Sequence, residues 1–356
     1  MKKMISLFVV ILFASLLFGC GGDDDANDGS FTPIKLVPQQ ANIMACADLA
    51  RIFDEIDIAG FYEEFPKEPD DPQTFEEALD MLGIEELDEA ILFGDISDLA
   101  GSDDLMGGDA GYFGFILKGT FNENQLIDTI ESESEVEITT TDYKGYTIYT
   151  DDSEDMSIAF LGESIMVIST AEPIRDVIEI REGDQSAVKG EILRTYNDLG
   201  SGLFKLAMIM PEELLESMEE GMDEEDAMGM NPMAIVENLK TVGLVVDKRG
   251  DSVPIDVRIC FADEEAAENM KGMLAFMMGM MDFDEMGASS EDAGMMTDIL
   301  QGLEIDLDGS CIEIGLEITS EMIEDMAGSF TESFEDFGFG DSLEIEPEIP
   351  FKIPKQ

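Results

Sequence analysis

The chain has 356 residues, with 82 acidic residues against 19 basic ones and a net charge of −63 at neutral pH. Such a surface repels nucleic acid and anionic lipid headgroups, so we expect neither as a partner. The absence of histidine argues against Ser-His-Asp and Cys-His catalysis, ordinary zinc sites and histidine-based pH switching. Hydrophobic residues make up 44% of the chain, which is enough for a folded core.

The first twenty residues have the pattern of a secretory leader. Two lysines precede an almost unbroken apolar run at residues 4–18, and the chain becomes polar after Cys20. A charged start, an apolar run of about 7–15 residues and a small residue before the cut are typical of a signal peptide. The run is shorter than the roughly 20 apolar residues of a transmembrane helix. We therefore expect residues 1–19 to be a signal peptide that is removed.

Leu17, Gly19 and Cys20 close that run, and this ending resembles the lipobox of bacterial lipoproteins. In that family the cysteine thiol is diacylated, the leader is removed, and the new N-terminus is usually acylated as well. The resemblance implies lipidation at Cys20 and a place in the cell envelope, on the outer side of the cytoplasmic membrane or in the outer membrane. An ordinary cleaved leader without a lipid is the alternative.

Composition divides the rest of the chain into four parts. Residues 20–30 form a flexible acidic linker that begins at the lipidated cysteine. We expect a first folded half at 31–200 and a second, Met-rich half at 201–330. An acidic tail at 331–356 contains three prolines near its end, which forbid a central strand, so we expect it to be extended.

Alternation of apolar residues and Gly-containing turns predict the elements of both halves. In the first half we predict strands at 43–48, 88–96, 111–119, 136–143, 146–150, 157–161 and 165–170, with helices at 49–56, 75–82, 121–130 and 173–180. In the second half we predict strands at 202–210, 239–247, 253–261, 303–307 and 311–318, with helices that begin at 211, 263 and 320.

The order of elements in the second half repeats the order in the first. The junction at 119–123, where a strand passes into a helix, parallels the junction at 260–264. We therefore interpret the chain as a degenerate duplication. The predicted fold class is α+β, with two related halves, each an antiparallel sheet covered on one face by helices.

Methionine is concentrated in the second half, where 16 of the 25 methionines lie between Met208 and Met296. Within the helix predicted at 263–281, apolar residues recur at the spacing of one face. Core packing by a pliable helix is one interpretation, and a groove for a lipid or an apolar peptide is another. Thioether ligation of copper is a third. The residues that would line the groove are Met270, Met273, Met277 and Met281.

Two cysteines of the second half are predicted to lie on the less apolar face of their strands. In its strand, Cys260 alternates with apolar neighbours and so faces away from them, and Cys311 lies opposite the apolar face of the later hairpin. If those strands are neighbours, a Cys260–Cys311 disulfide can form in an oxidising compartment. Unpaired thiols are the alternative.

No catalytic motif accompanies these features. The chain has neither a Gly-x-Ser-x-Gly elbow nor a phosphate-binding loop ending in Lys-Ser/Thr, and no acid pair can be located from the sequence. We therefore expect a protein that is not an enzyme and needs no cofactor.

The stretches 142–149, 158–169 and 173–178 are similar to uncharacterised extracytoplasmic bacterial domains in which a meander of strands leads into a helix, and the similarity covers about residues 36–215. That similarity implies no activity. Taken together, the sequence predicts a lipid-anchored extracytoplasmic protein with a binding or scaffolding role. Its alternatives are a carrier of a lipid or other apolar ligand and a binder of calcium or copper.

Overall fold

The computed structural model describes residues 32–56, 58–64, 72–97, 111–134, 138–151, 156–215, 238–280, 299 and 302–319. Its strands all belong to one sheet. They are β1 (Ile43–Asp48), β2 (Ile84–Gly94), β3 (Phe113–Phe121), β4 (Thr139–Tyr143), β5 (Tyr146–Thr150), β6 (Ser157–Phe160), β7 (Ile165–Ser169), β8 (Phe204–Ile209), β9 (Leu239–Val246), β10 (Ser252–Phe261), β11 (Glu304–Asp308) and β12 (Cys311–Thr319).

Most of the described helices occur, in chain order, among the strands of the first half. They are η1 (Pro33–Leu36), α2 (Leu49–Glu55), α3 (Ile58–Glu64), α4 (Phe75–Met81), α5 (Glu123–Ser134), α6 (Ala171–Glu182), α7 (Glu191–Asp198) and α10 (Glu264–Met280). Local signals fix several of their ends. Thr74 and Glu77 form a capping box at the start of α4, and Gly183 ends α6 in the left-handed conformation at φ 83°.

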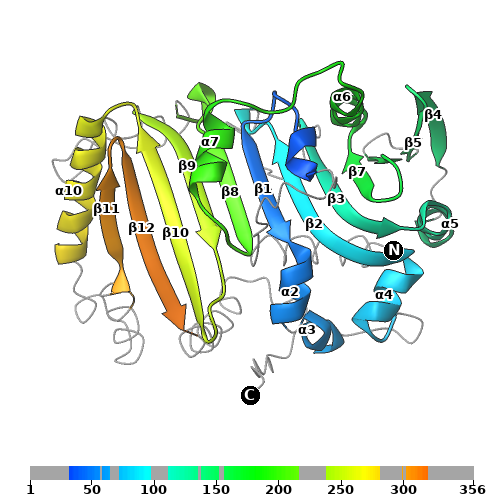
Figure 1. The fold of residues 1–356 in the computed structure, drawn as a ribbon, viewed down its shortest axis with the longest axis horizontal. Helices are drawn as coiled ribbons and strands as arrows, with labels where there is room; N and C mark the ends of the chain where they lie inside the picture. The colour runs from blue at the N-terminus through cyan, green and yellow to red at the C-terminus, as the bar shows by residue number, and fades with distance from the viewer. Residues whose placement is uncertain are drawn as a thin grey trace, which may run out of the picture.

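The sheet has twelve strands in the order β11-β12-β10-β9-β8-β1-β2-β3-β7-β6-β5-β4, and every pair is antiparallel. Figure 1 shows it as one continuous layer across the molecule. The predicted α+β class with antiparallel strands is thus confirmed. The halves do not form separate sheets, because β1 pairs with β8 from Ile43↔Met208 to Ala47↔Phe204. That pairing removes two edges that would otherwise leave backbone groups unsatisfied.

Helices cover both faces of the sheet around β1, β2, β3 and β7. On one face, buried residues of η1, α6 and α7, among them Leu36, Ile178 and Ile192, share a core cluster with β1–β3. On the other face, α2 and α5 bury Ile52 and Leu126 against the alternate residues of the same strands. The prediction of helices on one face does not describe this half, because β2, β3 and β7 carry apolar residues on both faces.

In the second half, α10 packs on one face of β10, β11 and β12. Its residues Ala266 and Ala267 join Phe261 and Ile312 in a small cluster. On the opposite face, α7 crosses from the first half onto β8 and β9, as Figure 1 shows. There Thr195 donates a buried 3.2 Å hydrogen bond to Thr241.

The predicted elements agree with the structure in type, with ends that differ by four residues or fewer for the twelve strands. The short helices α3, α7 and η1 were not predicted. The leader with Cys20, the linker and the tail at 331–356 lie outside the described residues, as does the helix predicted after Ser320. Within the part of the chain that the structure describes, no helix is long and apolar enough to cross a membrane.

Candidate functional site

A disulfide lies in the second half, on the face of β10 and β12 opposite α10. Cys260 on β10 and Cys311 on β12 are direct cross-strand partners, with their Cα atoms 4.0 Å apart and their sulfurs bonded. Alternation along each strand places both thiols on the face opposite Ile259 and Ile312. The structure thus brings together the two cysteines that the sequence placed on one kind of surface.

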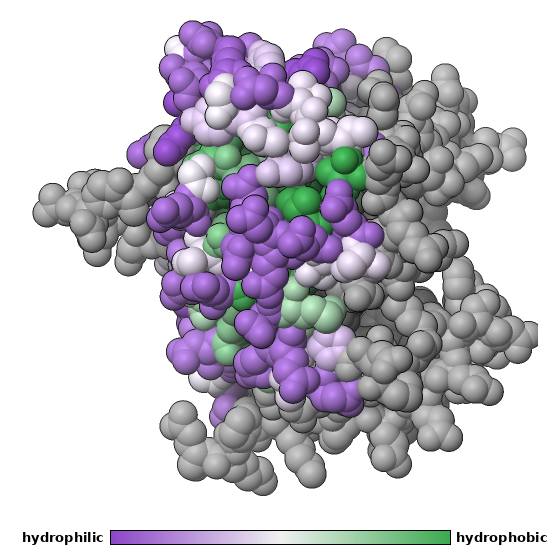
Figure 2. Space-filling view, turned by 90° about the vertical axis from the view of Figure 1, so that its right-hand side faces the viewer, coloured by the Kyte–Doolittle hydropathy of each residue, from purple (hydrophilic) through white to green (hydrophobic). Residues whose placement is uncertain are grey.

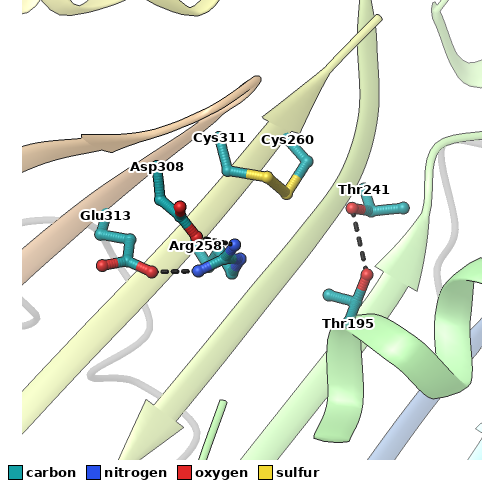
Figure 3. Close-up of a disulfide and its surroundings, with 7 residues drawn as sticks. All are labelled: Thr195, Thr241, Arg258, Cys260, Asp308, Cys311 and Glu313. Atoms are coloured by element: carbon teal, nitrogen blue, oxygen red, sulfur yellow. Dashed lines mark hydrogen bonds and ion pairs between the residues drawn. A yellow bond between two sulfur atoms is a disulfide. The ribbon is translucent and has the colours of Figure 1, made fainter. Parts of the chain in front are cut away.

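Beside the disulfide, Arg258 bridges two carboxylates. Its guanidinium donates to Asp308 at 2.6 Å and to Glu313, and Figure 3 shows this trio next to the sulfur bridge. Arg258 is 16% exposed, whereas the side chain of Asp308 is 65% exposed. In Figure 1, no described helix crosses this face of β10, β12 and β11. The described part of this face is therefore polar, and one covalent and two ionic cross-strand links connect its strands.

The candidate groove residues lie along α10. Met270 packs against the cluster around Phe261 and Ile312, which is a core position, and Met273 is half-buried. Met277 belongs to the helix but its side chain lies outside the described part, as does Met281 entirely. Toward the end of the helix the outer side is apolar too, because Phe276 is 53% exposed and residues 272–280 contain no charge.

The β4–β5 hairpin is held from both faces by tyrosine hydroxyl groups. Its turn places Lys144 at φ 54° and Gly145 at φ 86°, the left-handed pair that a two-residue hairpin turn requires. The tyrosine contacts share one chemistry, a phenol that donates to a carboxylate. They are Tyr143 to Glu179 at 2.6 Å, Tyr146 to Glu182 at 2.8 Å, and Tyr149 to Glu123 at 2.6 Å.

These contacts change the acidity of the groups that make them. Hydrogen bonds from Tyr143, Gln185 and Lys144 lower the pKa of Glu179 to about 2. The hydrogen bond to Glu123 raises the pKa of Tyr149 to about 12. The pKa of Lys144 is raised by its 2.7 Å contact with Asp184. These shifts keep Glu179 ionised and the hydroxyl group of Tyr149 protonated near neutral pH.

The described residues contain no group of three or more Cys, Asp or Glu side chains placed to hold a metal ion. Cys20, the predicted lipidation site, lies outside them. Sequence reasoning did not find the tyrosine–carboxylate contacts or the Arg258 bridge. The spacing of Glu179 and Glu182 along one side of α6 was a signal for the tyrosine–carboxylate contacts, but the partner tyrosines come from a hairpin distant in the sequence.

No protein-family model matches the chain, and no curated protein matches it by sequence. Among solved structures, the chain is similar to TP0453 in three crystal forms. For form III the TM-score is 0.46 at 9% identity, over 85% of this chain and 100% of that one. For forms I and IV the TM-scores are 0.43 and 0.44 at 11% and 10% identity, over 85% and 83% of this chain and 98% and 96% of those chains.

Proposed function

We propose that this protein is a lipid-anchored extracytoplasmic lipoprotein with a non-enzymatic binding or scaffolding role. The observation that carries the proposal is the leader, an apolar run that ends in Leu17, Gly19 and Cys20. The acyl chains on Cys20 attach the protein to the membrane, since two or more chains give stable anchoring where one does not. The folded part then stands on the outer side, behind the acidic linker at 20–30.

The Cys260–Cys311 disulfide supports this location. Structural disulfides persist in oxidising compartments and are rare in the cytosol. The two cysteines are direct partners on neighbouring strands, so oxidation needs no movement of the backbone. A protein exported through its leader meets the conditions under which this bond forms.

The anchor is tested by metabolic labelling of cells that express the full chain with an alkyne-bearing palmitate analogue. We expect label on the wild-type protein, none on Cys20→Ser, and release of the variant from the membrane fraction. The double variant Cys260→Ala/Cys311→Ala is the matched control and should keep its label. An unlabelled wild-type protein that retains its leader in the cytosol would contradict the proposal.

A second candidate function is the carriage of a lipid or other apolar ligand along α10. The observation that favours it is the uncharged stretch at 272–280, where Phe276 is 53% exposed although helices that are apolar on all sides are normally buried. Native mass spectrometry of protein purified without detergent tests it. A co-purifying lipid that is lost in Phe276→Glu supports a carrier, and a clean apo mass contradicts it.

We also propose that the two halves are related copies. Outward from the β1–β8 junction, β2, β3, β7 and β6 follow on one side and β9, β10, β12 and β11 follow on the other. In each half the helix after the third strand, α5 or α10, precedes a corresponding hairpin, β6–β7 or β11–β12, and in the first half β4 and β5 come between the helix and that hairpin. Those hairpins turn at Gly162 and Gly309, with φ of 92° and 60°. This correspondence supports a duplication, and β4 and β5 have no counterpart in it.

A further inference from the structure

Within the part of the chain that the structure describes, the outer edge of β4 is not paired with another strand. β4 ends the sheet, pairs only with β5 among the described strands, and has four exposed residues followed by the half-buried Tyr143. Figure 2 views the molecule from this side and shows a surface that is mostly hydrophilic or neutral, with small hydrophobic patches. An open edge offers backbone N–H and C=O groups to another chain.

The register of β4 against β5 shows which backbone groups of β4 face the outer edge. Tyr143 and Tyr146 flank the two-residue turn, so they form a hydrogen-bonded pair, and such pairs alternate along an antiparallel ladder. Thr141 and Thr139 therefore bond to β5 in the same way. The N–H and C=O groups of Thr140 and Asp142 point to the open edge.

The two edge strands of the sheet differ in how well they are protected against pairing with another chain. The other edge strand, β11, carries Glu304, Asp306 and Asp308 in five residues, and α10 packs against it. Charges on an edge strand are a usual defence against the pairing of edges. β4 has the sequence Thr-Thr-Thr-Asp-Tyr, which is β-branched and aromatic apart from Asp142. In a chain with 28% charged residues, this edge is comparatively undefended.

The strand is also held in place before any partner arrives. Tyr143 and Tyr146 fasten the hairpin to α6 on one face, and Tyr149 fastens it to α5 on the other. Lys144 adds ion pairs to Glu179 and Asp184 at the turn. A strand that is fixed in its extended form loses little conformational freedom on binding, which favours affinity.

We propose that the edge of β4 binds an extended segment of a partner protein by strand addition. This inference rests on the proposed binding role and assigns that role to a surface. The segment is β-forming and flanked by Lys or Arg, because a chain of net charge −63 repels an acidic strand and attracts a basic one. For the same reason a second copy of this chain is a poorer occupant.

The test uses the full folded protein and the peptide Lys-Lys-Thr-Val-Thr-Val-Thr-Lys-Lys. Its matched control is the same peptide with alternate backbone amides N-methylated, which keeps the charge but cannot pair. We expect the control to bind at least roughly tenfold more weakly, a difference of about 1.4 kcal/mol. We also expect the unmodified peptide to slow the hydrogen exchange of the Thr140 and Asp142 amides.

Variants of the protein complete the test. Thr140→Pro removes an N–H that faces outward and leaves the bonds to β5, a substitution that edge strands tolerate, so it should abolish the preference between peptides. Thr147→Ala on β5, which is exposed but not at the edge, should retain this preference.

Equal binding of both peptides to the wild type, or exchange unchanged at Thr140 and Asp142, would overturn the proposal. So would protection that appears without peptide as the protein concentration rises, because the occupant would then be a second copy. None of these outcomes bears on acylation of Cys20, so the two proposals fail separately.

Discussion

Cys260 and Cys311 lie directly opposite each other on β10 and β12, and their disulfide closes a loop with a sequence separation of 51 that contains α10. A cross-link stabilises a fold mainly by restricting the unfolded chain, more so for longer loops. For this separation the chain-entropy relation gives about 4 kcal/mol. We therefore expect Cys260→Ala/Cys311→Ala to lower the free energy of unfolding by up to about that amount, measured by urea denaturation.

The matched control for this prediction lies at the far end of the same strand pair. Ser252 and Thr319 are also direct partners but share no covalent bond. Ser252→Ala/Thr319→Ala should cost about 1 kcal/mol or less. If the cysteine variant were as stable as this control, the disulfide would contribute nothing to the stability of the second half.

Gly119 and Gly272 should respond oppositely to the same substitution. Gly119 is buried in β3, and a Cβ there would overlap the backbone carbonyl of Glu86 at a bulge in the β2–β3 ladder. Backbone atoms cannot move aside as the end of a flexible side chain can. Gly119→Ala should therefore lower the free energy of unfolding by about 1–3 kcal/mol. Gly272 lies exposed within α10 with open space around it, so Gly272→Ala should stabilise by about 0.5–1 kcal/mol. Thermal unfolding of the two variants checks both signs, and a shift in the same direction would contradict the structure.

The sequence was sufficient to predict the strands, because alternation and Gly turns are local signals. The turn at Lys144 and Gly145 is an example, since its residues alone require a tight hairpin. It was not sufficient to predict that the two halves share one sheet. That outcome depends on the pairing of Ala45 with Leu206, residues far apart in the chain, and no local pattern encodes such a pairing. Short helices such as α7 (Glu191–Asp198) were missed because they are stabilised by packing on the sheet more than by their own length.

Glu179 is expected to titrate far below an ordinary glutamate. Its pKa falls from 4.5 to about 2, chiefly because Tyr143 donates a hydrogen bond to the carboxylate. A carboxyl group whose pKa is lowered on folding stabilises the fold at pH values above its unfolded pKa. That contribution is therefore present above about pH 4.5 and is lost as the pH falls toward 2. NMR titration of the Glu179 side-chain carboxyl carbon measures the pKa directly.

Two phenylalanine variants test whether the hydrogen bond from Tyr143 lowers the pKa of Glu179. Tyr143→Phe removes the hydrogen bond and should move the pKa of Glu179 back toward 4.5. Tyr149→Phe removes a hydrogen bond of the same kind, to Glu123 on α5, and should leave Glu179 unchanged. A wild-type Glu179 that titrates near 4.5 would show that the hairpin is not fastened to α6 in this way.

The candidate sites were predictable to different degrees. The faces of Cys260 and Cys311 followed from alternation within each strand, but their adjacency required β10 and β12 to pair, which the sequence left as a condition. The sequence allowed Met270 to be either a core residue or a groove residue. Its contact with the Phe261 cluster depends on tertiary packing, which the sequence pattern does not show. The exposed edge of β4 was not foreseen, because which strand ends a sheet depends on the order of all the others.

Thr195 and Thr241 provide a test of how α7 is joined to the second half. Their hydroxyls form a buried hydrogen bond across the α7–β9 contact, which Figure 3 shows near the disulfide. Thr195→Val or Thr241→Val alone leaves one buried hydroxyl without this partner, so each should cost about 1–3 kcal/mol. The double variant replaces both polar groups with apolar groups of the same shape and should cost clearly less than the sum. Urea denaturation of the four proteins gives the coupling energy, which we expect to be about 1 kcal/mol. Strictly additive effects would mean that the two hydroxyls do not interact across the α7–β9 contact.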